Sequence, residues 1–413
     1  MGGAAVAHAD GIPSRGGACC ADLEERVAEL EATTARKGNR RVSLTISGQV
    51  TTALMAWDDG DRSDVYIVDP PTAGGTLFTF AGSAKVNPSL TAGFNITIGL
   101  DRGARSHQVT ADDDDGAGPG DAGKGDTTMV MTLANWYLDH KSLGRVTVGR
   151  INTATAGVSG VNLGGTSVIA NVNLGYWNRS FDAQGTASTW TNLLGGNTMN
   201  GSTLSRANAI SYSSPTVGGF SVSAAWGEND LWDAALRYAG EFGGFRLAAA
   251  VGYGQNIGGL GEAFDDNDDA GDGTGITKAS ASLLHVGTGL YLTGAYVHQD
   301  DNGHDNQHDG TLYYLQGGIT KNWTGLGNTA FYAEYANVDT DKTVDVAGDG
   351  FPRFTYNANT DVWGLGVVQH IDAAAMELFL SYRNYSGGTH IVNGGDVDAE
   401  DMDIVMGGAR IRF

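Results

Sequence analysis

The stretch that decides the fold is residues 90–100, LTAGFNITIGL, in which apolar side chains alternate strictly with small or polar ones. In an extended strand, successive side chains point to opposite faces, so Leu90, Phe94 and Ile98 share one face. The other face carries only Gly, Asn and Thr. Such a strand separates an apolar phase from a polar one.

The same alternation continues from Val42 to Phe413, and the segments that interrupt it are alternately short and long. The short ones carry turn residues such as Gly, Pro, Asn and Asp, and the long ones are rich in Gly and Asp. An even number of strands returns both ends of a single-chain membrane barrel to the same side. The alternating segments predict sixteen strands, at residues 42–56, 76–87, 90–102, 127–138, 145–152, 207–214, 219–227, 231–241, 244–255, 275–286, 290–300, 311–322, 328–339, 358–371, 376–387 and 400–413.

The small polar face argues against a soluble β-sandwich, whose core needs large side chains at close-packed density. No apolar run approaches the roughly 18–20 residues of a membrane-spanning helix, so any membrane passage must use strands. We therefore predict an all-β protein, a transmembrane 16-stranded antiparallel β-barrel with a short N-terminal helix.

Composition excludes one large class of partner. The chain has 25 Lys and Arg against 47 Asp and Glu, a net charge of −22, so we expect no nucleic acid partner. Cys19 and Cys20 are adjacent and offer no disulfide framework. Residues 1–20 are predicted to be the remnant of an export signal, because a small-x-small pattern precedes Asp10; a flexible Ala/Gly terminus is the alternative.

Residues 21–38 have the heptad pattern of a short coiled coil. Leu23, Val27, Leu30 and Thr34 are spaced by four, three and four residues and are flanked by charges. Two heptads seldom associate alone, so this helix would join chains only if something else gathers them. An amphipathic helix packed on its own domain is the alternative.

The C-terminal strand carries a candidate assembly signal. Phe413 ends an alternating strand, and its arrangement with Gly408 and Ile411 resembles the terminal signal by which the barrel-assembly machinery recognises outer-membrane proteins.

Three phrases together resemble the alphaproteobacterial (rhizobial-type) porin family: CADLEERVAELEATTARKGNRRVSLTISGQV (20–50), MTLANWYLDHKSLGRVTVGR (131–150) and MGGARIRF (406–413). The resemblance implies a homotrimer of 16-stranded barrels in the outer membrane, formed by residues 41–413, with the N-terminal helix in the periplasm. It also implies passive diffusion of small hydrophilic solutes and ions.

The longest connection, residues 153–206, follows the fifth predicted strand, which is the position of the constriction loop in porins. Sixteen-stranded barrels leave an aqueous channel, so an inward loop is what narrows it. The resemblance points to Arg150 as a wall arginine facing this loop. Strict alternation puts Arg150 on the face of Val148, so this role requires a bulge at Gly149.

Other charged residues are candidates to line the constriction, either from the loop or from predicted lumen faces. Opposed charges there would create a transverse field that favours polar solutes. Lumen salt bridges remote from the narrowest point are the alternative. The candidates are Arg179, Asp182, Arg206, Arg237, Arg246, Arg383 and Glu334.

The long loops are crowded with acids, which suit Ca²⁺ or Mg²⁺, although no cofactor is required. The densest run contains Asp265, Asp266, Asp268 and Asp269 and predicts a low-affinity, nonspecific site. His298, His304 and His308 form a candidate Zn²⁺ site. The alternative is a set of solvated loop faces, which would bias access toward cations and bridge outer-membrane lipid and lipopolysaccharide through divalent ions.

Three competing functions are weighed against a diffusion pore. A barrel hydrolase needs Ser and His together on a lipid-facing site, which the apolar strand faces do not carry, so no enzyme is predicted. A channel selective for a sugar or other specific solute is an alternative. A structural tether, in which the N-terminal helix reaches toward peptidoglycan, is compatible with a pore.

Overall fold

A computed structural model describes residues 42–101, 105–112, 128–186, 188–195, 205–228, 230–256, 274–301, 308–344, 354–391 and 395–413. The predicted coiled-coil positions Leu23, Val27, Leu30 and Thr34 lie outside the described residues, as do the two cysteines and the acidic positions Asp265, Asp266, Asp268 and Asp269. Within the described part, no helix is long and apolar enough to cross a membrane.

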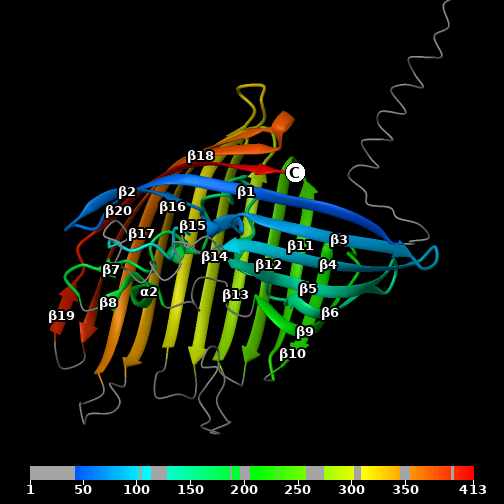
Figure 1. The fold of residues 1–413 in the computed structure, drawn as a ribbon, viewed down its shortest axis with the longest axis horizontal. Helices are drawn as coiled ribbons and strands as arrows, with labels where there is room; N and C mark the ends of the chain where they lie inside the picture. Colours follow the sequence, from blue (N-terminus) through cyan, green and yellow to red (C-terminus); the bar gives the residue numbers. More distant parts are fainter. Residues whose placement is uncertain are drawn as a thin grey trace, which may run out of the picture.

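Sixteen antiparallel strands form one closed ring, as the alternation predicts (Figure 1). Each strand pairs with the next, and the last pairs with the first, so the barrel has no free edge. The strands are β1 (Ser43–Asp58), β3 (Leu77–Lys85), β4 (Leu90–Asp101), β5 (Thr128–His140), β6 (Gly144–Asn152), β9 (Arg206–Ser213), β10 (Phe220–Gly227), β11 (Trp232–Phe242), β12 (Phe245–Asn256), β13 (Thr274–His285), β14 (Leu290–Asp301), β15 (His308–Lys321), β16 (Thr329–Val344), β17 (Phe354–Ile371), β18 (Met376–Ile391) and β20 (Met402–Arg412).

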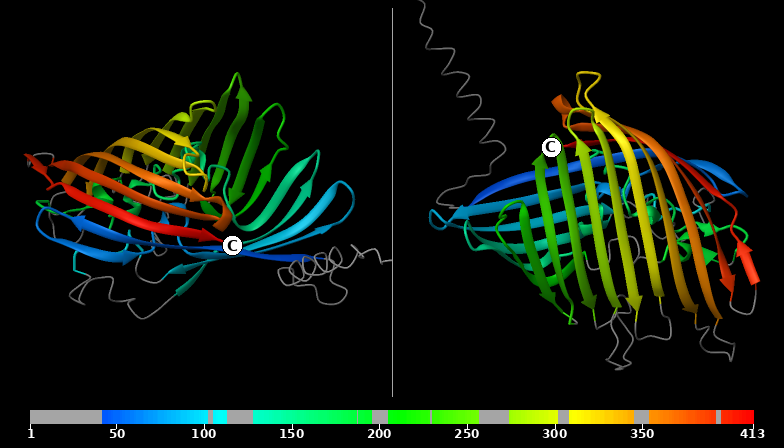
Figure 2. Two further views of the ribbon diagram at one scale, coloured as in Figure 1. Left: turned by 90° about the horizontal axis from the view of Figure 1, so that it is seen from above. Right: turned by 180° about the vertical axis from the view of Figure 1, so that it is seen from behind.

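The ring closes where the two ends of the barrel chain meet, as Figure 2 shows from above. β1 pairs with β20 from Gln49↔Arg412 to Asp58↔Asp403. One residue further, Gly48 and Phe413 exchange two backbone hydrogen bonds of 2.9 and 3.1 Å. A Cβ on Gly48 would lie 2.7 Å from the Phe413 ring, so only glycine leaves room for this terminal aromatic. The C-terminal Phe413 is therefore part of the closing seam.

Two short strands pair with strands of the ring without being part of it. β2 (Ser63–Val68) pairs with the end of β1 at the side of the long connections, and β19 (Gly395–Asp398) pairs with the corresponding end of β18. Between β2 and β3, residues 69–76 leave the wall and include the short 3-10 helix η1 (Pro71–Ala73). Gln49 holds this excursion by donating to the carbonyls of Ala73 and Gly75, at 2.8 and 2.6 Å.

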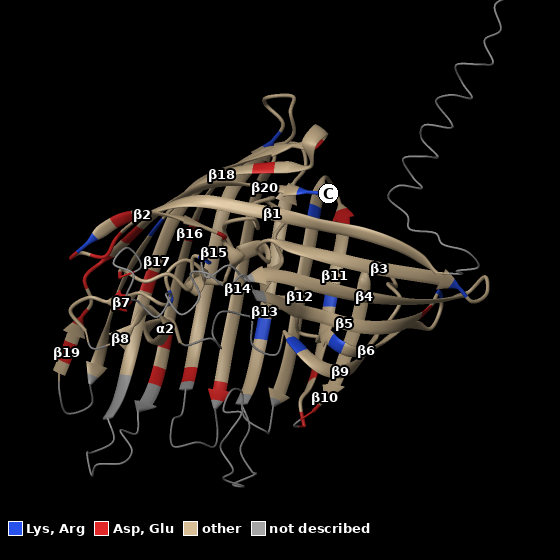
Figure 3. Ribbon diagram, viewed as in Figure 1, with Lys and Arg blue, Asp and Glu red and all other residues tan. Residues whose placement is uncertain are grey.

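The alternation sorts side chains between lipid and lumen. On β11, Leu236 is 42% exposed on the outer face, whereas the neighbouring lumen position Asp233 is 1% exposed. Acidic positions gather toward the ends of β14–β16 that meet the long connections, and basic positions lie on β6, β9 and β13 (Figure 3). Acidic positions thus predominate on these strand ends.

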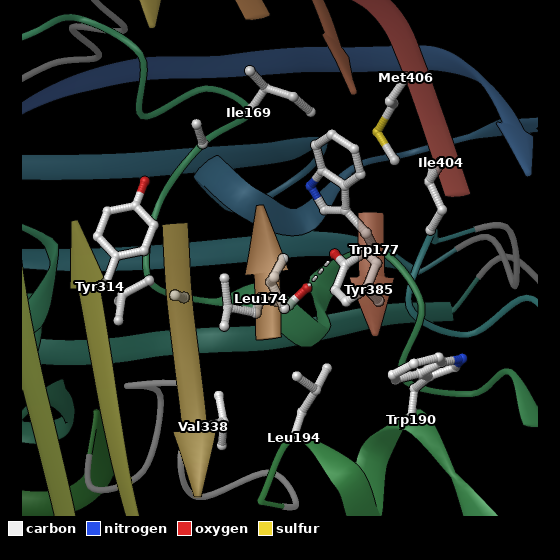
Figure 4. Packing of buried hydrophobic residues seen from close by; sticks show 14 of the residues in the cluster. Ile169, Leu174, Trp177, Trp190, Leu194, Tyr314, Val338, Tyr385, Ile404 and Met406 are labelled. Atoms are coloured by element: carbon white, nitrogen blue, oxygen red, sulfur yellow. Dashed lines mark hydrogen bonds between the residues drawn. The ribbon is translucent and has the colours of Figure 1, made fainter. Parts of the chain in front are cut away.

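The main apolar core lies inside the barrel, between the wall and the connection after β6. This connection, called here the inward loop (residues 153–186 and 188–195), contains η3 (Val158–Gly160), η4 (Leu174–Tyr176), β7 (Asp182–Ala183), β8 (Ser188–Thr189) and α2 (Trp190–Leu193). Its Trp177, Phe181 and Trp190 are fully buried. Trp177 and Trp190 pack on Arg383 and Tyr385 of β18 (Figure 4), and Phe181 packs on Trp57 of β1. Part of the lumen is therefore filled by packed side chains, as a narrowed channel requires.

Candidate pore constriction

A cavity of about 1160 Å³ lies in the part of the lumen that the inward loop leaves open. Small polar residues of β3–β6 and β9–β11 form one side of it, and the inward loop forms the other. Among the described residues that line this cavity there is no Asp or Glu. We call it the arginine cavity, after its five arginines: Arg105, Arg150, Arg179, Arg206 and Arg237.

The inward loop is fixed to the opposite wall along its length, so the opening has a defined size. Tyr385 on β18 donates to the carbonyl of Leu174 at 3.0 Å, an interaction drawn in Figure 4. Thr360 on β17 donates to the carbonyl of Leu193 at 2.9 Å. At the loop's tip, Nε2 of His370 lies 2.9 Å from the carbonyl oxygen of Gly165.

The first turn of the inward loop is clamped by two charged residues of β11. Asp233 accepts from the backbone N–H groups of Ala154 and Thr155, at 2.9 and 2.6 Å. Arg237 donates from NH2 to the carbonyls of Ala154 and Ala156, at 2.6 and 2.9 Å. Because its other terminal nitrogen donates to Ser223 at 2.8 Å, Arg237 is mainly a clamp, although it lines the cavity.

Arg150 reaches the cavity through an unusual backbone at its neighbour. Gly149 has φ +125°, a backbone conformation that residues other than glycine rarely adopt. A Cβ at this position would lie 2.4 Å from the carbonyl oxygen of Ala134. The pairing of β5 with β6 continues through Asn135↔Gly149 and Ala134↔Arg150 without an inserted residue. The predicted bulge is therefore wrong, and a glycine kink turns Arg150 toward the lumen instead.

Arg105 was missed because it lies in what the sequence presents as an acidic outer loop. Residues 105–112 fold inward after β4, where Ser106 donates to the carbonyl of Tyr176 at 2.5 Å. Burial, followed by the nearby charges of Arg179 and Arg105, lowers the pKa of His107 from 6.5 to about 3. Burial also lowers the pKa of Arg179, and Arg105 adds to the effect.

Four of the predicted constriction residues do not line the arginine cavity. Arg383 and Glu334 occupy lumen-facing positions of their strands, as predicted, but the inward loop covers them. Their side chains are 0% and 1% exposed and form an ion pair of 2.6 Å. Arg246 is half exposed beside the short turn after β11, paired with Glu241 at 2.8 Å. Asp182 is exposed in β7. The alternation of side chains assigns residues to the lumen face, but it does not show which part of the wall the loop covers.

The predicted zinc site at His298, His304 and His308 falls partly outside the part of the chain that the structure describes. Within the described part of the chain, no three His, Cys, Asp or Glu side chains are placed to hold a metal ion. Nδ1 of His298 lies 3.0 Å from the hydroxyl of Thr311. His304 lies outside the described residues.

A closed antiparallel barrel with a packed inward loop and a polar lumen cavity is the architecture of a porin, a channel of the outer membrane. The chain belongs to the Gram-negative porin family, whose model matches residues 1–389. No curated protein sequence matches the chain.

Solved structures share the fold at low sequence identity. The anion-selective porin from Comamonas acidovorans is 18% identical, with 90% of this chain and 100% of that chain covered and a TM-score of 0.57. The trimer form of OmpT, an outer membrane protein of Vibrio cholerae, is 13% identical, with 91% and 100% covered and a TM-score of 0.53. OmpF of Salmonella typhi, in complex with daunomycin, is 14% identical, with 92% and 100% covered and a TM-score of 0.51.

Proposed function

We propose that this porin is a passive diffusion pore that favours small anions over cations. The observation that carries the proposal is the arginine cavity, with five arginines and no described acid on its lining. Rings of basic side chains select anions, because every ion that crosses a narrow pore must pass close to their positive charges. The porin of Comamonas acidovorans, which shares the fold, is described as anion-selective.

The acidic outer rim opposes this preference less than its charge suggests. Asp361 on β17 and Asp396 and Asp398 on β19 line a cavity at the side of the long connections, away from the arginine cavity. Exposed charges are screened within about 10 Å at 0.1 M salt, whereas charges in a narrow lumen are screened less. The narrow, arginine-lined part of the path is therefore the step that discriminates between ions.

We also propose how the chains are organised in the membrane. The V. cholerae protein was solved in a trimer form, and the heptad at residues 21–38 suits a homotrimer whose N-terminal helices lie in the periplasm, after an export-signal remnant at residues 1–20. The phrases at 20–50, 131–150 and 406–413 support membership of the alphaproteobacterial subfamily. The chain is proposed to act as a channel and not as an enzyme.

Other partners are proposed from the sequence. The acidic loops suit Ca²⁺ or Mg²⁺ and, through these ions, lipopolysaccharide. The terminal strand with Phe413 suits the barrel-assembly machinery, and the N-terminal helix suits peptidoglycan.

Single-channel recording in a planar lipid bilayer tests the proposal. Purified protein is expected to insert with large ohmic steps that occur in threes, because a trimer carries three parallel lumens. Membranes that stay silent at protein amounts that give channels with another porin would contradict the pore, and single steps would contradict the trimer.

A further inference from the structure

Residues 105–107 place two basic side chains against the inward loop. Besides the bond from Ser106 to Tyr176, Ser180 of the loop donates to the carbonyl of His107 at 2.7 Å. The imidazole of His107 lies 5.7 Å from the ring of Tyr176, centroid to centroid. Two hydrogen bonds and a ring contact thus hold a segment after β4 to a loop that follows β6. The fold keeps Arg105 and Arg179 close to His107 although the two guanidinium charges repel each other.

Two members of this cluster, Arg105 and His107, have hydrogen-bonding capacity that the described residues do not use. Nε of Arg105 and Nδ1 of His107 are both buried, and neither has a hydrogen-bond partner among the described residues. His107 is only 6% exposed, yet it lines the arginine cavity. A buried polar atom without a partner costs free energy, and such atoms at a cavity wall are a reason to look for a ligand. Both side chains line the cavity, where an anion would meet them.

We propose that Arg105, His107 and Arg179 form a saturable binding site for a small oxyanion with two negative charges, of which inorganic phosphate is the simplest. The inference rests on the proposed function, because the site lies on the path that anions would take. Guanidinium groups match the oxygens of phosphate in charge and geometry, and two of them balance a dianion better than a single chloride.

The state of His107 fits this role. With its pKa at about 3, the imidazole is neutral at pH 7 and offers one N–H donor and one acceptor. A neutral donor adds a directed hydrogen bond without adding a third repelling charge. Such a site would make the pore partly substrate-selective, because a bound dianion delays the chloride ions behind it.

Phosphate titration of chloride current tests the site. Purified wild-type trimers in a bilayer at fixed chloride concentration and pH 7.5 are expected to lose conductance saturably as phosphate is added. Arg105→Gln and His107→Phe should each raise the half-saturating phosphate concentration about tenfold, since a hydrogen bond to a charged group is lost. Arg246→Gln removes the same charge outside the cavity and should titrate like the wild type. His107→Phe keeps an aromatic ring beside Tyr176, so it provides a second variant should Arg105→Gln not assemble.

The outcomes separate this inference from the proposed function. Conductance that changes only in proportion to bulk phosphate, or saturation that is unchanged in both cavity variants, would overturn the site while leaving an anion-favouring pore in place. A wild-type channel that favours cations would contradict the proposed function itself.

Discussion

Asp233 on β11 accepts hydrogen bonds from both the backbone N–H and the hydroxyl of Thr155, at 2.6 and 2.8 Å. With its bond from Ala154, this carboxylate satisfies the first turn of the inward loop at the point where the chain leaves β6. The loop therefore enters the lumen at a fixed angle. The width of the pore depends on this contact as well as on the core behind the loop.

Removing the clamp should loosen the constriction. Asp233→Ala leaves two buried backbone donors without their acceptor, which is expected to lower the free energy of unfolding by about 1–3 kcal/mol. Open-channel current noise should rise because the first turn can move. Asp139→Ala, which removes an exposed acid paired with Arg145, is the matched control and should leave both quantities nearly unchanged. Equal noise in the two variants would mean that Asp233 does not hold the loop.

The buried pair of Arg383 and Glu334 is expected to act on stability and not on selectivity. Glu334→Gln leaves the guanidinium buried without its counter-charge, beneath the ring of Trp177 at 4.6 Å, and should cost about 3–5 kcal/mol. The double variant Glu334→Leu with Arg383→Met should cost less than the single one, because no unpaired charge remains. Thermal unfolding in detergent measures this effect. A changed reversal potential in either variant would place the pair on the conduction path, contrary to its burial.

Arg150 is predicted to contribute to ion selectivity directly. Arg150→Ser should shift the reversal potential in a salt gradient toward cations, because one of the five charges of the cavity is removed. Gly149→Ala is expected to assemble poorly, since its Cβ would meet the Ala134 carbonyl at 2.4 Å. An unshifted potential in Arg150→Ser would remove Arg150 from the constriction.

The low pKa of His107 is expected to make the folded protein less stable in acid. Its folded-state pKa of about 3 lies below the ordinary value of 6.5, so between these values the unfolded chain binds a proton that the folded chain does not. Stability from this group therefore falls as the pH falls through that window and is unaffected above it. His107→Gln should show a smaller drop in unfolding temperature from pH 7.5 to pH 4.5 than the wild type does. An identical drop in both proteins would show that His107 is already protonated or exposed.

The barrel could be predicted from the sequence because lipid outside and water inside impose a local rule on every strand. The strand predicted at residues 231–241 is observed at Trp232–Phe242, and the strand predicted at 90–102 is observed at Leu90–Asp101. The same rule correctly gave Arg383 and Glu334 their lumen parity. It could not show that they are covered, because covering depends on contacts with the inward loop, such as the bond from Arg383 to Asn171, 212 residues away in the chain.

The arginine cavity was predictable only in part. Arg150 was a candidate from the family resemblance, Arg179 and Arg206 from their place in the loop, and Arg237 from its place on a lumen face. Arg105 was not, because no periodic pattern marks an irregular segment that folds inward and an acidic run follows it directly. The aromatic Trp177, Phe181 and Trp190 were the available signal for a packed loop. They indicate burial, but not the wall on which they pack.

The measurement that tests the account most directly is the zero-current potential of the wild-type pore between two potassium chloride solutions of different concentration. These two ions have nearly equal mobility in water, so the sign of the potential reports the charge preference of the pore. The five arginines predict the sign that corresponds to chloride permeating faster than potassium. The opposite sign, or a potential near zero, would contradict an anion-favouring constriction.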